Sequence, residues 1–192
     1  FAVSSIAPDL DGPRLTGGNF PLSATSFAAG TARVNWSANW DRDNQTLTYS
    51  LYRGTQAAPP IYTQTMTTPF WDLKRMGFND TGLTPGSTQR YRVVATDPFG
   101  NIAQSNWVTV TVSSSGSLST YAAAVLGDSP ANFWRLGEST GPTVYDWAGW
   151  SDAIASAGVS RGVTGAIGGD ADAAVHTDGT PAGLVATQSP QT

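Results

Sequence analysis

The chain of 192 residues has no cysteine, and this absence excludes disulfide bonds, thiolate catalysis and cysteine-ligated zinc. It has a single histidine, His176, so a multi-histidine metal site cannot form within one chain. Only 12% of the residues are charged, which is about half the share typical of globular domains. Turn-forming residues are frequent instead, and this favours short strands joined by many loops over long charged helices.

Basic residues are also scarce. Lys74 is the only lysine, the arginines are scattered singly, and the formal net charge is -4. Without a basic cluster the chain cannot neutralise a phosphate backbone, so nucleic acid is excluded as a partner. No apolar run approaches the roughly 18 residues of a membrane-spanning helix. The chain starts at Phe1 without the charged and apolar regions of a signal peptide, so we expect a processed or excised piece of a longer protein.

From Leu15 to Ser113 apolar and polar residues alternate with a period of two. In "TARVNWSANW" this predicts that Ala32, Val34 and Trp36 point inward and that Thr31, Arg33 and Asn35 point outward. The same alternation recurs in "TLTYSLYRG", "RYRVVAT" and "WVTVTV". Such segments indicate antiparallel strands with one buried and one solvated face, and about ten buried side chains at roughly 2 kcal/mol each make a substantial core. We expect this part to fold by itself.

Several motifs follow one another in this region in a familiar order. "VNWSANWDRDNQTLTYSLYRG", "DTGLTPG", "RYRVVATD" and "WVTVTV" resemble a bacterial fibronectin type III domain over residues 15–113. The resemblance implies a two-sheet sandwich, with Trp36 as the buried tryptophan of the second strand. It also implies a tyrosine at the corner before "RYRVVATD", whose hydroxyl returns to the backbone upstream. This chain has Gln89 at that position, so either the Gln89 amide replaces the hydrogen bond or the corner is looser, and Tyr91 is the next inward residue.

The remaining segments are organised around this domain. Residues 1–14 contain Pro8, Gly12 and Pro13 and are interpreted as a linker or the tail of an upstream module. Residues 114–119 form a Ser/Gly linker. Beyond it, we expect a helix over 121–126 and a strand over 131–137, "ANFWRLG".

Residues 120–192 carry a second resemblance. "YAAAVLGDSPANFWRLGE", "VYDWAGWSDA" and "GAIGGDADAAVHTDG" resemble the N-terminal part of a concanavalin or laminin-G-like jelly roll, as found in secreted actinobacterial and phage tail proteins. After Trp150 there is no aromatic residue and there are few large aliphatic residues, too few to close a second core. We therefore expect an all-β chain, a fibronectin type III sandwich plus an incomplete jelly roll, with a strand-completing partner for 120–192.

Candidate binding residues are few. Trp147 and Trp150 in "DWAGW" could stack on sugar rings, but we favour the alternative that they pack a small core or dock on a neighbouring subunit. Asp41 and Asp43 in "WDRDN" have a spacing that could hold calcium, but residues of this type also build turns. A second calcium candidate comprises the aspartates of the back half, Asp170, Asp172 and Asp178.

No catalytic motif accompanies these candidates. The chain contains neither of the phosphate-binding motifs G-x-x-x-x-G-K-[ST] and G-x-G-x-x-G. Glu138 is the only glutamate, which leaves a single glutamate for the catalytic carboxylate pair of a glycosidase. We therefore expect no catalytic residue and no cofactor other than calcium. The expected function is a non-catalytic extracellular module for adhesion, carbohydrate binding or assembly, secreted, surface-associated or part of a virion tail, with a polysaccharide or another protein subunit as its partner. The alternatives are an accessory region of a secreted polysaccharide-degrading enzyme, or a structural subunit of a surface filament or phage tail completed by a partner.

Overall fold

The structure is a computed structural model that describes residues 12–13, 22–114, 119–168, 173–180 and 183–186. Backbone contacts divide the chain into two units, Phe1–Gly116 and Ser117–Thr192, which we call the front unit and the back unit. Most of the predicted upstream segment 1–14 and of the predicted linker 114–119 lies outside the described residues.

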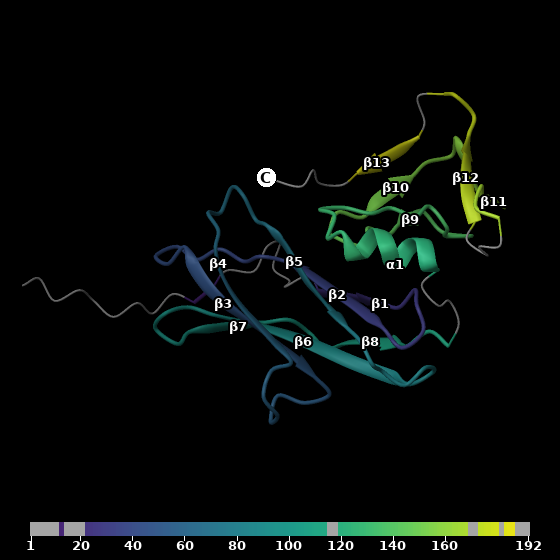
Figure 1. Cartoon of the computed structure of the whole chain (residues 1–192). Coiled ribbons are helices and arrows are strands. Elements are labelled where there is room, and N and C mark those ends of the chain that lie inside the picture. Colours follow the sequence, from purple (N-terminus) through teal and green to yellow (C-terminus); the bar gives the residue numbers. More distant parts are fainter. Residues whose placement is uncertain (1–11, 14–21, 115–118, 169–172, 181–182, 187–192) are drawn as a thin grey trace, which may run out of the picture. The chain divides into compact units, whose positions relative to one another are not determined.

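The front unit is built from antiparallel strands in two sheets. Strands β1, β2 and β5 form one sheet in that order, and β4, β3, β6 and β7 form the other, in which β8 also pairs with β6 (Figure 1). The predicted all-β sandwich is confirmed. The described strands are β1 (Leu22–Thr25), β2 (Ala32–Ser37), β3 (Thr46–Arg53), β4 (Tyr62–Thr67), β5 (Arg75–Asp80), β6 (Thr88–Thr96), β7 (Ile102–Gln104) and β8 (Val108–Thr111).

Side chains from both sheets form one buried apolar cluster. Trp36 of β2 and Met76 of β5 belong to it from the first sheet. The second sheet contributes Leu47, Tyr49 and Leu51 of β3, together with alternate residues of β6, namely Tyr91, Val93 and Ala95. Trp36 and the named residues of β3 and β6 stand at positions where the period of two predicts inward-facing side chains, so this part of the prediction is confirmed.

Strand β2 departs from the predicted alternation. Its residues Arg33 and Asn35 are buried like their neighbours, so the prediction that they face outward into solvent was wrong. Strand β2 lies between β1 and β5, and Ser23 on β1 donates a hydrogen bond of 2.7 Å to Oδ1 of Asn35. A buried amide is tolerated because a neighbouring strand supplies a hydrogen-bond partner, which periodicity alone cannot reveal.

Three loops leave the sandwich at the same end. The register pairs Ser37 at the end of β2 with Arg75 at the start of β5, and Thr46 at the start of β3 with Thr67 at the end of β4. On the other side of β3, Thr48 pairs with Thr96 at the end of β6. The loops 38–45, 68–74 and 97–101 therefore emerge together, and we call this the loop end of the front unit.

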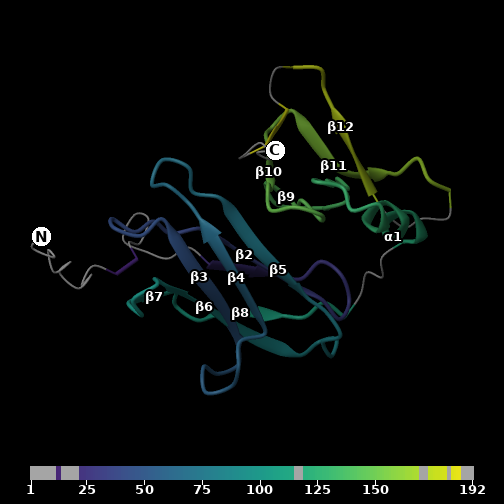
Figure 2. The same cartoon turned by 60° about the vertical axis from the view of Figure 1, so that its left-hand side comes forward.

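The back unit contains one helix and two small sheets within its described residues (Figure 2). Helix α1 (Thr120–Gly127) agrees with the predicted helix, and Oγ of Ser119 caps it by accepting a hydrogen bond from the Ala122 amide. No helix in the described part of the chain is long and apolar enough to cross a membrane. The strands are β9 (Thr143–Val144), β10 (Ala153–Ala155) and β13 (Leu184–Ala186) in one sheet, and β11 (Val159–Thr164) with β12 (Ala173–Thr177) in the other.

Residues 131–137 do not form the strand that the sequence predicted. Within this segment the structure has only an isolated antiparallel bridge between Trp134 and Asp146. The amide of Phe133 donates instead to the side-chain carboxylate of Asp146, and Leu136 has a φ of 62°. A left-handed residue cannot continue a strand, so the local conformation overrides the strand propensity of the sequence.

Candidate functional site

The base of the loop end is fixed by buried hydrogen bonds. The Tyr49 hydroxyl accepts a hydrogen bond of 2.6 Å from the Asn39 amide, and Oγ1 of Thr68 donates to the Asn39 carbonyl oxygen at 2.9 Å. All three residues are buried, and burial raises the pKa of Tyr49 to about 12 despite these hydrogen bonds. Two backbone hydrogen bonds, Ala38 N to Lys74 O and Thr68 N to Gln45 O, join the loops further. Loops 38–45 and 68–74 therefore share one rigid base.

Asp41 organises the tip of the first loop. Its Oδ1 accepts hydrogen bonds from the amides of Asp43 at 2.9 Å and of Asn44 at 3.1 Å, while its side chain is buried. These are the contacts of an aspartate-stabilised turn. Asp43 is exposed, so the two predicted calcium ligands lie in different environments of one loop.

Three aromatic side chains lie above this base: Trp40, Phe70 and Trp71, which we call the loop aromatic cluster. The ring centroids of Trp40 and Phe70 are 6.0 Å apart, and those of Phe70 and Trp71 are 4.8 Å apart with planes at 87°. Phe70 is 64% exposed and Trp71 is 71% exposed. Ring contacts hold the three side chains together, and most of the surface of Phe70 and Trp71 still faces solvent.

Charged groups are present beside the rings. Lys74 Nζ and Asp72 Oδ2 form an ion pair of 2.6 Å, and both side chains are partly exposed. Loops 38–45 and 68–74 hold three carboxylates (Asp41, Asp43, Asp72) and two cationic side chains (Arg42, Lys74), which leaves a net charge of -1. The surface around the cluster is therefore close to neutral.

The sequence analysis did not single out this cluster. Its signal is present in "TTPFWDLK", where two adjacent aromatic residues follow Pro69 between two strands. Adjacent residues of a strand point to opposite faces, and in a loop neither needs to point inward. Two neighbouring rings outside a strand were thus a signal of exposed aromatic surface.

In the back unit, Asp146 organises the predicted "DWAGW" segment. Its carboxylate is fully buried and accepts hydrogen bonds from the backbone amides of Phe133, Ala148, Gly149 and Ser151, and from the side-chain amide of Asn132. A carboxylate with five donors is stable in the interior without a cation. The primary role of Asp146 is therefore to shape the loop that follows it.

Trp147 and Trp150 are half-buried on this loop. The guanidinium of Arg135 stacks over the Trp147 ring at 4.5 Å from the centroid. One face of Trp147 is thus covered by a protein group. Arg135 also lines a cavity of about 240 Å³ beside α1, together with Tyr121, Phe133, Trp134, residues 165–167 and residues 173–174.

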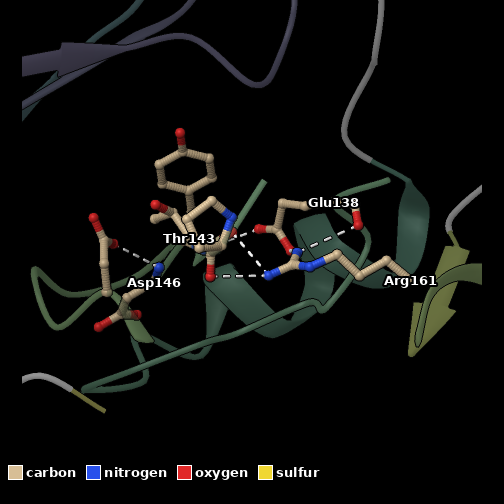
Figure 3. Close-up of polar contacts among 7 residues, drawn as sticks. Glu138, Thr143, Asp146 and Arg161 are labelled. Carbon is tan, nitrogen blue, oxygen red and sulfur yellow. Dashed lines mark hydrogen bonds and ion pairs between the residues drawn. The ribbon is translucent and has the colours of Figure 1, made fainter. Parts of the chain in front are cut away.

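The only glutamate has a structural partner as well (Figure 3). Oε1 of Glu138 accepts a hydrogen bond of 2.9 Å from the Tyr145 amide, and Oε2 lies 3.8 Å from Arg161 NH1. The same guanidinium donates to the carbonyl oxygens of Glu138, Pro142 and Thr143. Arg161 thereby connects β11 to the residues that lead into β9. These contacts fix the backbone of that segment and do not orient a reactive group.

The second group of predicted calcium ligands is only partly described. Asp170 and Asp172 lie outside the described residues. Asp178 is exposed, and hydrogen bonds from the Thr180 side chain and amide hold its pKa below the ordinary value. His176 is exposed on β12. Among the described residues, no group of three or more histidine, aspartate or glutamate side chains is close enough to hold a metal ion.

Comparison with known proteins gives matches to structures only. No family model and no curated protein matches the sequence. The chain is similar to the sixth fibronectin type III domain of human fibronectin type III domain containing protein 3, at 24% identity and a TM-score of 0.37, over 53% of this chain and 90% of that domain. It is also similar to the FN5 domain of Drosophila Lar, at 15% identity and a TM-score of 0.31, over 50% of this chain and 95% of that domain.

Proposed function

We propose that the chain is a non-catalytic extracellular binding module whose contact surface is the loop aromatic cluster. The observation that carries the proposal is the exposure of Phe70 and Trp71, at 64% and 71%, above a base held by buried hydrogen bonds. Exposed aromatic surface of this kind marks an interaction site, and a rigid base lowers the entropy lost on binding.

The broader setting rests on the two resemblances. A fibronectin type III sandwich followed by a jelly-roll domain is an arrangement of secreted and surface-associated proteins, so the proposed role is adhesion to a bacterial surface. Trp147 and Trp150 are a second candidate contact for a carbohydrate in the back unit, and Arg135, which stacks on the Trp147 ring, lines a cavity there.

Co-sedimentation with purified bacterial cell walls tests the proposed function. We expect the full chain to sediment with the walls and the double variant Phe70→Ala, Trp71→Ala to remain in solution. Phe99→Ala is the matched control, because Phe99 is also 64% exposed but lies on loop 97–101, which carries none of the three rings of the cluster. Equal sedimentation of the wild type and the double variant, or none by the wild type, would refute the proposal.

Assembly completed by a partner is the second candidate function. Ile154 lies on β10, the central strand of the sheet β13-β10-β9, and is 42% exposed. An apolar side chain exposed in the middle of a small sheet favours coverage by another chain. Sedimentation velocity of the wild type and of Ile154→Thr tests this: assembly that depends on Ile154 supports it, and a monomer at all concentrations contradicts it.

A further inference from the structure

The geometry of the loop aromatic cluster restricts the kind of ligand that it can bind. The planes of Phe70 and Trp71 stand at 87° to each other, so the two rings form a corner rather than a flat platform. Each ring still offers aromatic surface to solvent, since both are more than half exposed. A ligand that uses both rings must therefore present apolar faces in two orientations within a short distance.

The size of the surface is the second restriction. A stable protein interface buries about 800 Å² on each partner and involves roughly 20–30 residues a side. The loop aromatic cluster consists of three side chains, of which Trp40 is half-buried. It is small for a globular protein partner and suits a narrow chain-like ligand.

Charge is the third restriction. The two loops carry a net charge of -1, and Lys74, the only lysine, is already paired with Asp72 at 2.6 Å. A polyanion such as a uronic-acid polymer or an anionic membrane gains nothing from this surface. A ligand rich in hydroxyl groups, in contrast, can accept from the Lys74 ammonium and donate to the Asp72 and Asp43 carboxylates.

We infer that the loop aromatic cluster binds a neutral polysaccharide chain, with successive sugar rings stacked on Trp71 and Phe70 and their hydroxyl groups bonded to Asp72 and Lys74. Sugar rings combine apolar C–H faces with hydroxyl edges, which matches aromatic faces bordered by a carboxylate and an ammonium group. The orientation of the two rings selects a chain whose neighbouring sugars are rotated relative to one another. This inference rests on the proposed function and specifies the ligand of the same surface.

A competition experiment tests the class of ligand independently of the proposed binding function. Cell walls are digested with protease, and the polysaccharide is then released with a lytic enzyme and divided by anion exchange into neutral and acidic fractions. Each fraction competes with intact walls for the full chain in the co-sedimentation assay. We expect protease-treated walls to bind as well as untreated walls, and the neutral fraction alone to compete.

Variants at Trp71 identify the kind of contact. Trp71→Phe keeps an aromatic face, whereas Trp71→Leu keeps an exposed apolar side chain without one. If sugars stack on the ring, we expect the affinity for cell walls to fall about threefold in Trp71→Phe and about tenfold or more in Trp71→Leu. Asp72→Asn is expected to weaken binding as well, because an amide is a weaker acceptor for sugar hydroxyls than a carboxylate.

The outcomes can be told apart. Loss of binding after protease treatment, competition by the acidic fraction alone, or equal binding of the Leu and Phe variants would refute the polysaccharide inference while leaving the binding function intact. Failure of the wild type to bind untreated walls would refute the proposed function and the inference with it.

Discussion

The hydroxyl of Tyr91 donates a hydrogen bond of 2.8 Å to Oδ2 of Asp80, which lies on the opposite sheet of the front unit. Arg53, the cross-strand neighbour of Tyr91, donates to both oxygens of the same carboxylate at 3.0 and 2.9 Å. Two side chains of one sheet therefore hold a carboxylate of the other. The Gln89 amide donates to the Ser87 hydroxyl, so the alternative in which Gln89 replaces the corner tyrosine is not the one observed, and Tyr91 contacts the upstream Asp80 side chain.

Tyr91→Phe is predicted to destabilise the front unit by about 1–2 kcal/mol, because the buried Asp80 carboxylate loses one donor while keeping Arg53. Urea unfolding at neutral pH measures the change. Tyr52→Phe is the control: Tyr52 is half-buried on the neighbouring strand, and its hydroxyl makes no hydrogen bond within the described residues, so the expected change is within about 0.5 kcal/mol. Equal effects of the two variants would contradict the cross-sheet role of Tyr91.

The front unit is predicted to lose stability in alkaline solution. Burial raises the pKa of Tyr49 from 10.0 to about 12, and burial with the nearby Asp80 raises that of Tyr91. The unfolded chain releases these protons first, so stability is unchanged below pH 10 and falls as the pH rises through the interval up to about 12. For Tyr49 alone, the rise of the pKa from 10.0 to about 12 corresponds to a loss of about 3 kcal/mol in the free energy of unfolding across this pH interval.

Urea unfolding between pH 8 and pH 12 measures this dependence. Because Lys74 is the only lysine, tyrosines dominate titration in this range. Tyr49→Phe is expected to be less stable at pH 8, since Asn39 loses its partner, but to show a shallower decline above pH 10. Parallel declines for the wild type and this variant would show that Tyr49 does not contribute.

The sequence predicted the front sandwich well because its strands follow a simple physical rule. Leu47, Tyr49 and Leu51 alternate with polar residues and are completely buried. The rule failed at Arg33 and Asn35, because their burial depends on neighbouring strands and on hydrogen-bond partners such as Ser23. Periodicity describes one strand and contains no information on what covers its other face.

The candidate site could be predicted only in part, for a related reason. Trp147 was chosen because tryptophan rings stack on sugars, but Arg135, twelve residues earlier, covers one face of its ring. Phe70 and Trp71 were overlooked because loops show no periodicity, and their exposure follows from the base formed by Asn39, Tyr49 and Thr68. Exposure of an aromatic side chain is a tertiary property, which residue type alone does not determine.

Gly149→Ala is predicted to disrupt the "DWAGW" loop. A Cβ atom at this position would lie 2.5 Å from the Ala131 carbonyl oxygen and 2.6 Å from Oδ2 of Asp146. Because backbone and a buried carboxylate cannot both move aside, we expect the back unit to lose about 3 kcal/mol. Hydrogen exchange of the Ala148 and Ser151 amides, both bonded to Asp146, measures the effect locally.

Gly127→Ala provides the control for that substitution. Gly127 is the last residue of α1, and no heavy atom lies within 4 Å of a Cβ built there. Alanine has the higher helix propensity, so the expected effect ranges from none to a gain of about 1 kcal/mol. If Gly149→Ala were as harmless as Gly127→Ala, the close packing of this loop around Asp146 would be refuted.

Substitutions of Asp41 distinguish the turn interpretation of "WDRDN" from the calcium hypothesis. The turn needs an acceptor oxygen for the Asp43 and Asn44 amides, which asparagine also has, whereas calcium needs the charge. The turn interpretation predicts that Asp41→Ala lowers the free energy of unfolding by about 1–2 kcal/mol and that Asp41→Asn retains most of it. It also predicts that neither excess calcium nor a chelator changes the melting temperature of any of these proteins. Calcium binding predicts that the ion raises the melting temperature of the wild type, and that Asp41→Asn abolishes this rise as fully as Asp41→Ala. Because only calcium binding predicts that the wild type responds to the ion, thermal unfolding of these three proteins with calcium and with chelator decides between the hypotheses.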